Sequence, residues 1–257
     1  MKFSIPSYLR PKICYENAYS FLKREGISDD DIQIFVHSYL IKSYADYLPA
    51  KCLKALAPHE GITEARKLIR EHYQDGERVV SIDDDVNGLL SKRGKKLIKV
   101  EGQFKQHCQN GFEFSEHFGT KFWGVTMTEN PFYMKSKVRL CSCFCPGPLY
   151  GWIQDSSEEL IARIPYPLAE DLEFCARHVQ KFGAILRFEG ITFTKLPFYK
   201  TPGGVTEQIG GIEKRKEIEA TAFKWLIKEF PGLVIPSNSN MPIKMKRKKS
   251  ISADYIL

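Results

Sequence analysis

The sequence predicts an α/β fold with a mostly parallel central sheet. Three observations lead to this prediction. In the first 90 residues, short apolar strands alternate with segments whose apolar residues recur at helical spacing. The fourth of these strands is followed at once by three adjacent aspartates, Asp83, Asp84 and Asp85. The second half has a different, irregular pattern of strands and helices.

Four strands separated by three helices are expected in the first half. Apolar residues alternate along the strands, and Gly26 ends the first helix. The expected strands cover residues 2–7, 31–37, 53–57 and 79–82, and the expected helices cover 12–25, 40–47 and 62–73. Because helices join successive strands, we expect those strands to be parallel, with right-handed crossovers.

The second half is expected to begin with a lysine-rich excursion or mobile loop over residues 91–101. Strands are expected over 122–127, 138–145, 149–153 and 185–194, with the second and third paired through the turn Pro146-Gly147-Pro148. Helices are expected over 104–118, 171–182 and 213–230. A glycine-rich loop is expected over residues 201–211, where Gly203 and Gly204 are adjacent.

No clear linker interrupts the chain before residue 236, so we expect one domain over residues 1–235 with a first half over 1–90 and a second over 91–235. Residues 236–257 contain a basic run at 244–249, flanked by proline, serine and asparagine. We expect this segment to be a flexible basic tail. It either binds nucleic acid or aids solubility.

The composition is that of a globular protein with a full core, since 43% of the 257 residues are hydrophobic and 12% are aromatic. No apolar run approaches the roughly 20 residues of a membrane span. Pro6 and Arg10 come too early for the apolar region of a signal peptide. We therefore expect a cytoplasmic protein without a membrane partner. The net charge of +7 favours an anionic partner.

The seven cysteines are scattered and odd in number, so no disulfide framework is expected. Cys141, Cys143 and Cys145 alternate, and on a strand they would share one face. They are either ligands of a soft metal ion or small buried residues. The absence of Cys-x-x-Cys spacing and of a nearby histidine favours the second interpretation.

The three aspartates are the strongest functional signal. Adjacent carboxylates repel one another, and a hard divalent cation such as Mg²⁺ or Mn²⁺ explains their clustering, because it takes oxygen ligands and can bridge them to phosphates. In open α/β sheets, ligands bind at the carboxyl ends of the strands, which is where these residues fall. The alternative is an acidic turn that caps the next element.

Three more charged residues agree with a phosphate site. Arg66 lies in a helix just after a strand, where its guanidinium can contact a phosphate. Glu170 and Asp171 lie at a helix start, where the helix dipole favours ionised carboxylates and a carboxylate can take a proton from a hydroxyl. We infer that the first half binds a nucleotide and the second binds the acceptor of a transferred group. The alternatives are a surface cation for Arg66 and a helix cap for Asp171.

Four motifs resemble the glycosyltransferases of the GT-A fold. They are residues 5–10 (IPSYLR), residues 61–66 (GITEAR), residues 81–85 (SIDDD), which resemble the DxD motif, and the pair Glu170-Asp171. More narrowly, residues 2–235 resemble the TET/JBP-associated glycosyltransferases. Those enzymes occur mainly in phages and are associated with sugar addition to 5-hydroxymethylpyrimidine bases of DNA.

The resemblance implies an enzyme that moves a sugar from a nucleotide-sugar, such as UDP-glucose or UDP-GlcNAc, to 5-hydroxymethylcytosine or a related base in DNA, with inversion. It makes Asp171 the general base, supported by Glu170, and makes Asp85 and Asp83 the ligands of Mn²⁺ or Mg²⁺. The implied nucleotide-sugar contacts are Pro6, Ser7, Tyr8, Arg10, Arg66, Asp83, Asp84, Gly203, Gly204 and Arg215. One departure is Lys67, where asparagine is common in related enzymes.

Trp152, Lys92 and Arg93 are the candidate acceptor contacts. Trp152 is the tryptophan expected to face the acceptor. Lys92 and Arg93, together with Lys95 and Lys96, lie in a loop that could contact the DNA backbone; an exposed solvated loop is the alternative. If phage-encoded, the enzyme would act in the host cytoplasm, and no obligate protein partner is expected. Three other functions stay open: a GT-A enzyme acting on a glycan, lipid or protein, a nucleotidyltransferase, and a DNA-binding protein with an inactive transferase fold.

Overall fold

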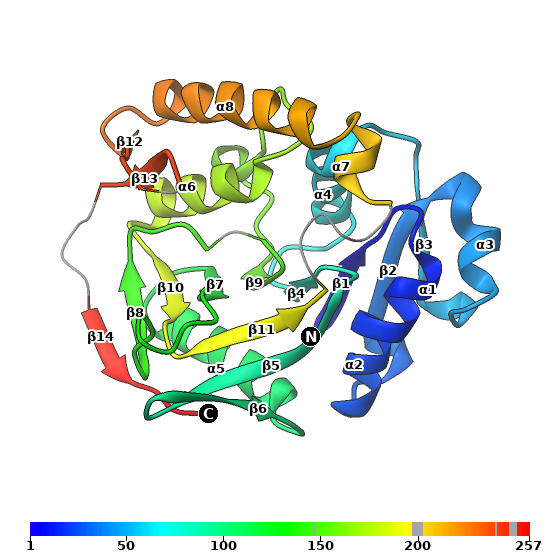
Figure 1. Cartoon of the computed structure of the whole chain (residues 1–257), viewed down its shortest axis with the longest axis horizontal. Coiled ribbons are helices and arrows are strands. Elements are labelled where there is room, and N and C mark those ends of the chain that lie inside the picture. The colour runs from blue at the N-terminus through cyan, green and yellow to red at the C-terminus, as the bar shows by residue number, and fades with distance from the viewer. Residues whose placement is uncertain (146, 197–202, 240, 247–250) are drawn as a thin grey trace.

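The computed structural model describes residues 1–145, 147–196, 203–239, 241–246 and 251–257. Its centre is a nine-stranded sheet with the strand order β14-β8-β10-β7-β9-β4-β1-β2-β3 (Figure 1). Along the chain, these strands are β1 (Lys2–Pro6), β2 (Ile32–His37), β3 (Leu53–Leu56), β4 (Arg78–Ile82), β7 (Phe122–Val125), β8 (Lys137–Cys141), β9 (Leu149–Ile153), β10 (Ile185–Phe188) and β14 (Ile251–Asp254).

Most strands of this sheet run in one direction. β1 pairs in parallel with β2 and β4, β2 with β3, and β7 with β10. β9 is antiparallel to its neighbours β4 and β7, and β8 is antiparallel to its neighbours β10 and β14. Among the described strands of the sheet, β8 and β9 therefore oppose all the others. The predicted mostly parallel α/β sheet is confirmed.

Helices cover both faces of the sheet. One face packs against α1 (Pro11–Cys14), the π-helix η1 (Tyr15–Tyr19), α2 (Ser20–Arg24) and α5 (Phe104–His117), and the other packs against α4 (Gly61–Glu71), α6 (Glu170–Phe182) and α8 (Ile212–Glu229). Short helices complete the chain: η2 (Asp29–Asp31), η3 (Ser38–Leu40), α3 (Ile41–Ala45), η4 (Ala50–Cys52), η5 (Glu158–Leu160) and α7 (Val205–Gln208). Within the described residues, no helix combines the length and apolar character needed to cross a membrane.

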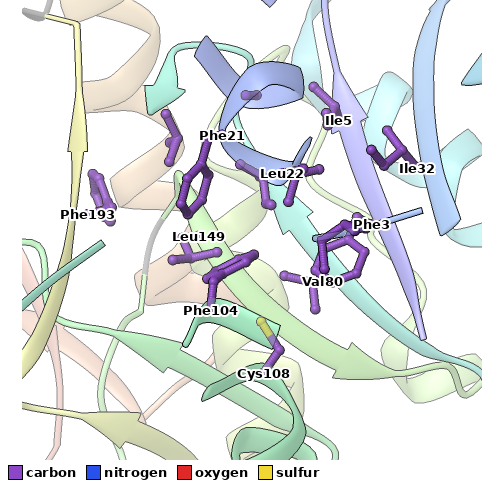
Figure 2. Packing of buried hydrophobic residues seen from close by; sticks show 14 of the residues in the cluster. Phe3, Ile5, Phe21, Leu22, Ile32, Val80, Phe104, Cys108, Leu149 and Phe193 are labelled. Atoms are coloured by element: carbon purple, nitrogen blue, oxygen red, sulfur yellow. The ribbon is translucent and has the colours of Figure 1, made fainter. Parts of the chain in front are cut away.

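The strand residues alternate between two hydrophobic cores, as a pleated strand buried on both faces requires. In β4, Val80 and Ile82 belong to one core and Val79 to the other. Figure 2 shows the first core, in which Val80 lies near Phe3 of β1 and Phe104 of α5. Burial on both faces explains why the adjacent residues Val79 and Val80 are both apolar.

Residues 91–101 are not a mobile loop, so that prediction is wrong. β5 (Val86–Arg93) and β6 (Lys96–Val100) form a hairpin that continues through β11 (Ile191–Lys195) as a separate three-stranded sheet. Lys95, Lys96 and Lys99 of this hairpin are exposed, whereas Leu89 and Val100 are buried in the first core. The expected single strand over 185–194 is accordingly two strands, β10 and β11, which belong to different sheets.

The expected hairpin between residues 138–145 and 149–153 is also wrong. β9 lies between β4 and β7, whereas β8 lies between β10 and β14. β8 ends at Cys141, so the three alternating cysteines do not share one strand. All seven cysteines are free thiols. Pro146, the first residue of the predicted turn, lies outside the described residues.

The C-terminal segment is largely built into the fold, which corrects the prediction of a flexible tail over 236–257. β12 (Val234–Pro236) pairs with β13 (Ile243–Met245), and β14 pairs with β8 at the edge of the large sheet (Figure 1). Ile243 and Met245 are buried, whereas Lys244 between them is exposed. Apolar and basic residues alternate along β13, which is the pattern of a strand with one buried face. The high charge of the segment obscured this pattern in the sequence. Residues 247–250 of the basic run lie outside the described residues.

Tyr255, just after β14, tests whether this segment supports the folded state. Its hydroxyl lies 3.1 Å from His107 Nδ1 and accepts a hydrogen bond from Asn110 Nδ2 at 3.2 Å. Its ring centroid lies 4.6 Å from that of Phe188. We expect Tyr255→Ala to lower the free energy of unfolding by about 3 kcal/mol, because it removes aromatic packing and leaves polar groups unpaired.

Ile256→Ala is the matched control for this prediction, because the neighbouring Ile256 side chain is 58% exposed. Its effect should stay below about 0.5 kcal/mol. Urea denaturation of both variants measures the difference. Equal stability of the two variants would show that the C-terminal segment does not contribute to the fold.

Candidate active site

The three aspartates occupy a tight turn between β4 and β5. The Asp83 N–H donates to the Pro148 carbonyl at 2.9 Å, and the Asp83 carbonyl accepts from the Val86 N–H at 3.1 Å. This turn gives the three carboxylates different polar neighbours: Arg66 for Asp83, Ser7 for Asp84 and Lys195 for Asp85. The adjacent aspartates are therefore not equivalent.

Asp84 is buried and ties the acidic turn to the loop after β1. Its Oδ2 accepts a hydrogen bond from Ser7 Oγ at 2.6 Å, and its Oδ1 lies 3.4 Å from Arg10 Nη1. Burial raises the pKa of Asp84 to about 7 even though Arg10 and Ser7 favour its charged form. Asp84 thus positions Ser7 and Arg10 on the cavity wall.

Arg66 connects the acidic turn with the second acidic pair. Its side chain, on α4, is 7% exposed. Nη2 donates to Asp83 Oδ1 at 2.9 Å and to the Gly147 carbonyl at 3.3 Å, while Nη1 donates to Glu170 Oε1 at 2.8 Å. Burial alone would lower the pKa of Arg66, but Tyr150, Glu170 and Asp83 together raise it. The guanidinium is therefore a permanent charge between two acidic elements.

Glu170 and Asp171 begin α6. Ala169 before them has a φ of 71°, a left-handed conformation that is rare outside glycine, so the helix starts on a strained residue. Asp171 Oδ1 accepts the Leu172 N–H at 2.8 Å. Burial raises the pKa of Glu170 to about 7 and also raises the pKa of Asp171. Carboxyl groups tuned in this direction are suited to proton transfer near neutral pH.

The glycine pair closes against the loop after β1. Gly203 and Gly204 both have a φ of 78°. The Gly203 carbonyl accepts from Arg10 Nη2 at 2.7 Å, and the Gly204 N–H donates to the Tyr8 carbonyl at 3.2 Å. A Cβ on Gly204 would lie 2.6 Å from the Arg10 guanidinium carbon, so a larger residue would displace the Arg10 side chain, and the positive φ also favours glycine. Residues 201–202 of the predicted loop lie outside the described residues.

These elements surround a cavity of about 1090 Å³. Every residue predicted to bind the nucleotide-sugar or the metal, or to act in catalysis, contributes to its wall. They come from the ends of β1 and β4, from α4 and α6, from the glycine pair and from the start of α8. The residues are Pro6, Ser7, Tyr8, Arg10, Arg66, Asp83, Asp84, Asp85, Glu170, Asp171, Gly203, Gly204 and Arg215.

Trp152 does not line this cavity, so its predicted acceptor contact is wrong. It lies on β9, a central strand covered on both faces, and it is 3% exposed. Its indole Nε1 donates to Gln154 Oε1 at 2.9 Å, and its ring packs against Tyr73 and Phe174. The local sequence could not show that β9 is inserted between β4 and β7.

Lys92 and Arg93 lie outside the cavity wall, and their predicted contact with the DNA backbone stays a prediction. Both belong to β5, which begins at the acidic turn and runs away from it (Figure 1). Lys92 Nζ donates to the Met134 carbonyl at 2.5 Å, and Arg93 donates to the Leu257 carbonyl. Both cations therefore fasten neighbouring backbone segments.

Sequence analysis missed several residues of the cavity wall. Lys195, at the end of β11, has its Nζ 3.9 Å from Asp85 Oδ2. His37 and His59 line the wall near Tyr8, with their Nε2 atoms 3.1 Å apart. His37 ends β2, so the rule that ligands bind at the carboxyl ends of parallel strands could have identified it. No sequence signal indicated Lys195, because the pairing of β11 with β5 alone brings it to Asp85.

The acidic turn offers one oxygen atom that suits a divalent cation. Asp85 Oδ1 is buried and has no hydrogen-bond partner among the described residues. Burial and the nearby Asp83 raise the pKa of Asp85 to about 6. A cation that takes one or two carboxylates and completes its shell with phosphates and water fits this arrangement. No three His, Cys, Asp or Glu residues in the described part of the chain are placed to enclose a metal ion by themselves.

Comparison with known proteins establishes the fold. No protein-family model and no curated protein matches the sequence. The structure of S. aureus TarS 1–349 in complex with UDP-GlcNAc matches with a TM-score of 0.54 at 13% identity, over 88% of this chain and 67% of that chain. The structure of TarS 1–349 in complex with UDP matches with a TM-score of 0.51 at 14% identity, over 88% of this chain and 66% of that chain. The structure of a mycobacterial protein matches with a TM-score of 0.50 at 10% identity, over 99% of this chain and 83% of that chain.

The fold is of the GT-A type. The chain spans about two thirds of the TarS 1–349 fragment and 40% of a longer TarS chain. The resemblance in the motifs and the likeness in three dimensions therefore agree on the GT-A architecture. At identities of 10% to 14%, the likeness concerns the fold.

The Arg66 bridge makes a prediction about stability. Arg66→Met should lower the free energy of unfolding by about 3–5 kcal/mol, because Glu170, with a side chain 3% exposed, loses its cation while buried. The double variant Arg66→Met/Glu170→Gln should recover part of this loss, since the neutral amide removes the unpaired charge. Urea denaturation at neutral pH measures both variants.

Lys67→Met is the control for the Arg66 variants, because the neighbouring Lys67 side chain is 39% exposed. It should change the free energy of unfolding by less than about 0.5 kcal/mol. A double variant no more stable than Arg66→Met would show that the charge of Glu170 does not depend on Arg66.

Proposed function

We propose that this chain is a metal-dependent glycosyltransferase that moves a sugar from a UDP-sugar to the hydroxyl of 5-hydroxymethylcytosine, or a related hydroxymethylpyrimidine, in DNA with inversion. The observation that carries the proposal is the Arg66 bridge, which holds the acidic turn and the Glu170–Asp171 pair on the wall of one cavity. TarS structures of the same fold contain UDP and UDP-GlcNAc, which supports a nucleotide-sugar donor. The motif resemblance and the net charge of +7 support the DNA acceptor.

In this proposal, the donor diphosphate lies beside the acidic turn. Asp85 and Asp83 would hold Mn²⁺ or Mg²⁺, which neutralises charge on the departing diphosphate when bound. Arg215 and Lys195 line the same cavity and supply further positive charge toward the phosphates. The glycine pair, hydrogen-bonded to Tyr8 and Arg10, covers the nucleotide end and helps to exclude water.

Asp171 acts as the general base. Its Oδ1 accepts the Leu172 N–H, so the proton of the acceptor hydroxyl is assigned to Oδ2. The hydroxyl oxygen forms a bond to the anomeric carbon of the sugar, the bond from that carbon to the diphosphate breaks, and the proton moves to Asp171. Glu170, paired with Arg66, positions Asp171 relative to the donor. A base in duplex DNA would have to leave the stack to reach this carboxylate.

The direct test is incubation with a panel of nucleotide-sugars and Mn²⁺, using DNA that contains 5-hydroxymethylcytosine and ordinary DNA. Nucleoside mass spectrometry should show a hexose-sized or N-acetylhexosamine-sized gain on the modified base alone. Chelation with EDTA and the variant Asp85→Ala should each abolish the gain, because both remove the cation. The control Asp46→Ala, at an exposed carboxylate that does not line the cavity, should keep it. Metal-dependent hydrolysis of the nucleotide-sugar without any gain on DNA would support the fold-level function with a glycan, lipid or protein acceptor.

A second prediction concerns the general base. Asp171→Asn should lower kcat for transfer by about 10²–10⁴-fold and leave the Kd for UDP nearly unchanged, because the amide cannot take the proton. Steady-state kinetics and calorimetric titration with UDP measure the two quantities. Full activity of this variant would contradict the assignment. DNA binding by the unaltered protein without turnover of any nucleotide-sugar would favour an inactive transferase fold that binds DNA.

A further inference from the structure

The cavity continues past the residues assigned to the donor, along the surface of α8. Arg215, Glu219 and Phe223 line it at intervals of four residues, so they lie on one face of the helix. With a rise of about 1.5 Å per residue, this wall extends about 12 Å from Arg215 to Phe223. Figure 1 shows that α8 leads from α7 toward β12 and β13. The cavity therefore has a second end near the C-terminal hairpin.

This second end differs chemically from the first. The donor end holds the aspartates, Arg66 and the glycine pair. The second end is largely apolar, with Glu219 of α8 beside it. Its apolar residues are Leu168, Leu172, Ala220, Phe223, Met241 and Pro242. A sugar or a phosphate would find few polar partners among these side chains. The surface suits a flat or apolar group.

Asp171 lies at the boundary between the two ends. It follows Leu168 by three residues and precedes Leu172, and all three line the cavity at the start of α6. A hydroxyl that gives its proton to Asp171 while attacking a donor beside Asp83 must approach from the other side. That side is the apolar end.

The β12–β13 hairpin adds positive charge beside the apolar end. Met241 and Pro242 line the cavity, and the exposed residues Lys244, on β13, and Lys246, just after it, follow along the chain. At about 3.3 Å per residue, Lys244 lies about 7 Å along the chain from Pro242. The apolar end is thus continuous with a cationic edge.

We propose that the apolar end and the β12–β13 hairpin form the acceptor-binding site, and that its ligand is a single strand of nucleic acid. A base bearing the hydroxyl packs against Phe223, Met241 and Pro242, while Lys244 and Lys246 contact the neighbouring phosphates. Stacking on an aromatic side chain combined with lysine contacts to the backbone is how proteins bind single strands. The inference rests on the proposed function, because it uses Asp171 as the point where the acceptor hydroxyl reacts.

The β5–β6 hairpin is the competing basic surface. Lys92 and Arg93 of this hairpin donate to backbone carbonyls, whereas Lys95 and Lys96 at its turn are exposed. This turn has no residue on the cavity wall. It therefore supplies a matched pair of lysines for comparison.

Binding of a short single-stranded oligodeoxynucleotide containing 5-hydroxymethylcytosine, measured by fluorescence anisotropy across a salt series, tests the hairpin. The variant Lys244→Ala/Lys246→Ala should weaken binding, and the slope of log Kd against log salt should fall by about 1.4, or about 0.7 for each phosphate that the protein no longer neutralises. The control Lys95→Ala/Lys96→Ala should keep the slope of the unaltered protein. A reduced slope in the control pair, or an unchanged slope in both pairs, overturns the proposal.

Phe223→Ala tests the apolar end. It should weaken binding of the same oligonucleotide about tenfold, because the stacking surface is removed, and raise the KM for modified DNA while kcat changes little. Phe132→Ala, at a ring that is 83% exposed elsewhere on the chain, is the control and should change neither quantity. Unaltered binding by Phe223→Ala overturns the proposed base contact.

The binding measurements separate this inference from the proposed function. They need no sugar transfer, so binding that depends on Lys244, Lys246 and Phe223 supports the acceptor site even if no nucleotide-sugar is turned over. Conversely, sugar transfer to the modified base that none of these substitutions affects leaves the proposed function standing and rejects this acceptor site. A UDP titration of every variant verifies that the donor end is intact.

Discussion

The ion pairs of Arg66 are the constraint on which the rest of the site depends. A buried guanidinium is strongly unfavourable unless carboxylates compensate it, and here it has one from the turn after β4 and one from the start of α6. These two elements lie 87 residues apart in the sequence, from Asp83 to Glu170. Because a single cation contacts both, a displacement of either element would leave a charge unpaired inside the protein. The bridge therefore sets the distance between the proposed donor and acceptor positions.

The direction of the strands explains why these charges meet. β1, β2 and β4 are parallel neighbours, so their carboxyl ends lie at one edge of the sheet and present Ser7, His37 and the aspartates to the same space. Apolar residues on both faces of β4 anchor that edge between two cores. Well-packed cores thus hold in place a turn whose three aspartate carboxylates repel one another. The cost of that repulsion is offset by Arg66, Ser7 and Arg10, and in the proposed mechanism by a cation.

The C-terminal segment completes part of the cavity wall. Met241 and Pro242 bring the β12–β13 hairpin to the cavity wall, and Tyr255 and Leu257 pack on the first core. The C-terminal segment, whose charge predicted a solvated tail, therefore contributes both to the core and to the proposed acceptor site. The exposed lysines and the buried apolar residues alternate, so one segment serves both purposes.

The sequence by itself determined the elements whose signals are local. Alternation of strands and helices predicted the parallel half of the sheet, and the acids after β4 and at the start of α6 identified residues that share the cavity. The tertiary structure alone decided which strands pair across long separations: β9 between β4 and β7, β11 beside β5, and β14 beside β8. Those pairings buried Trp152, brought Lys195 to Asp85 and turned Lys92 away from the cavity. Local spacing carries no information on such contacts, because they depend on how distant apolar faces pack together.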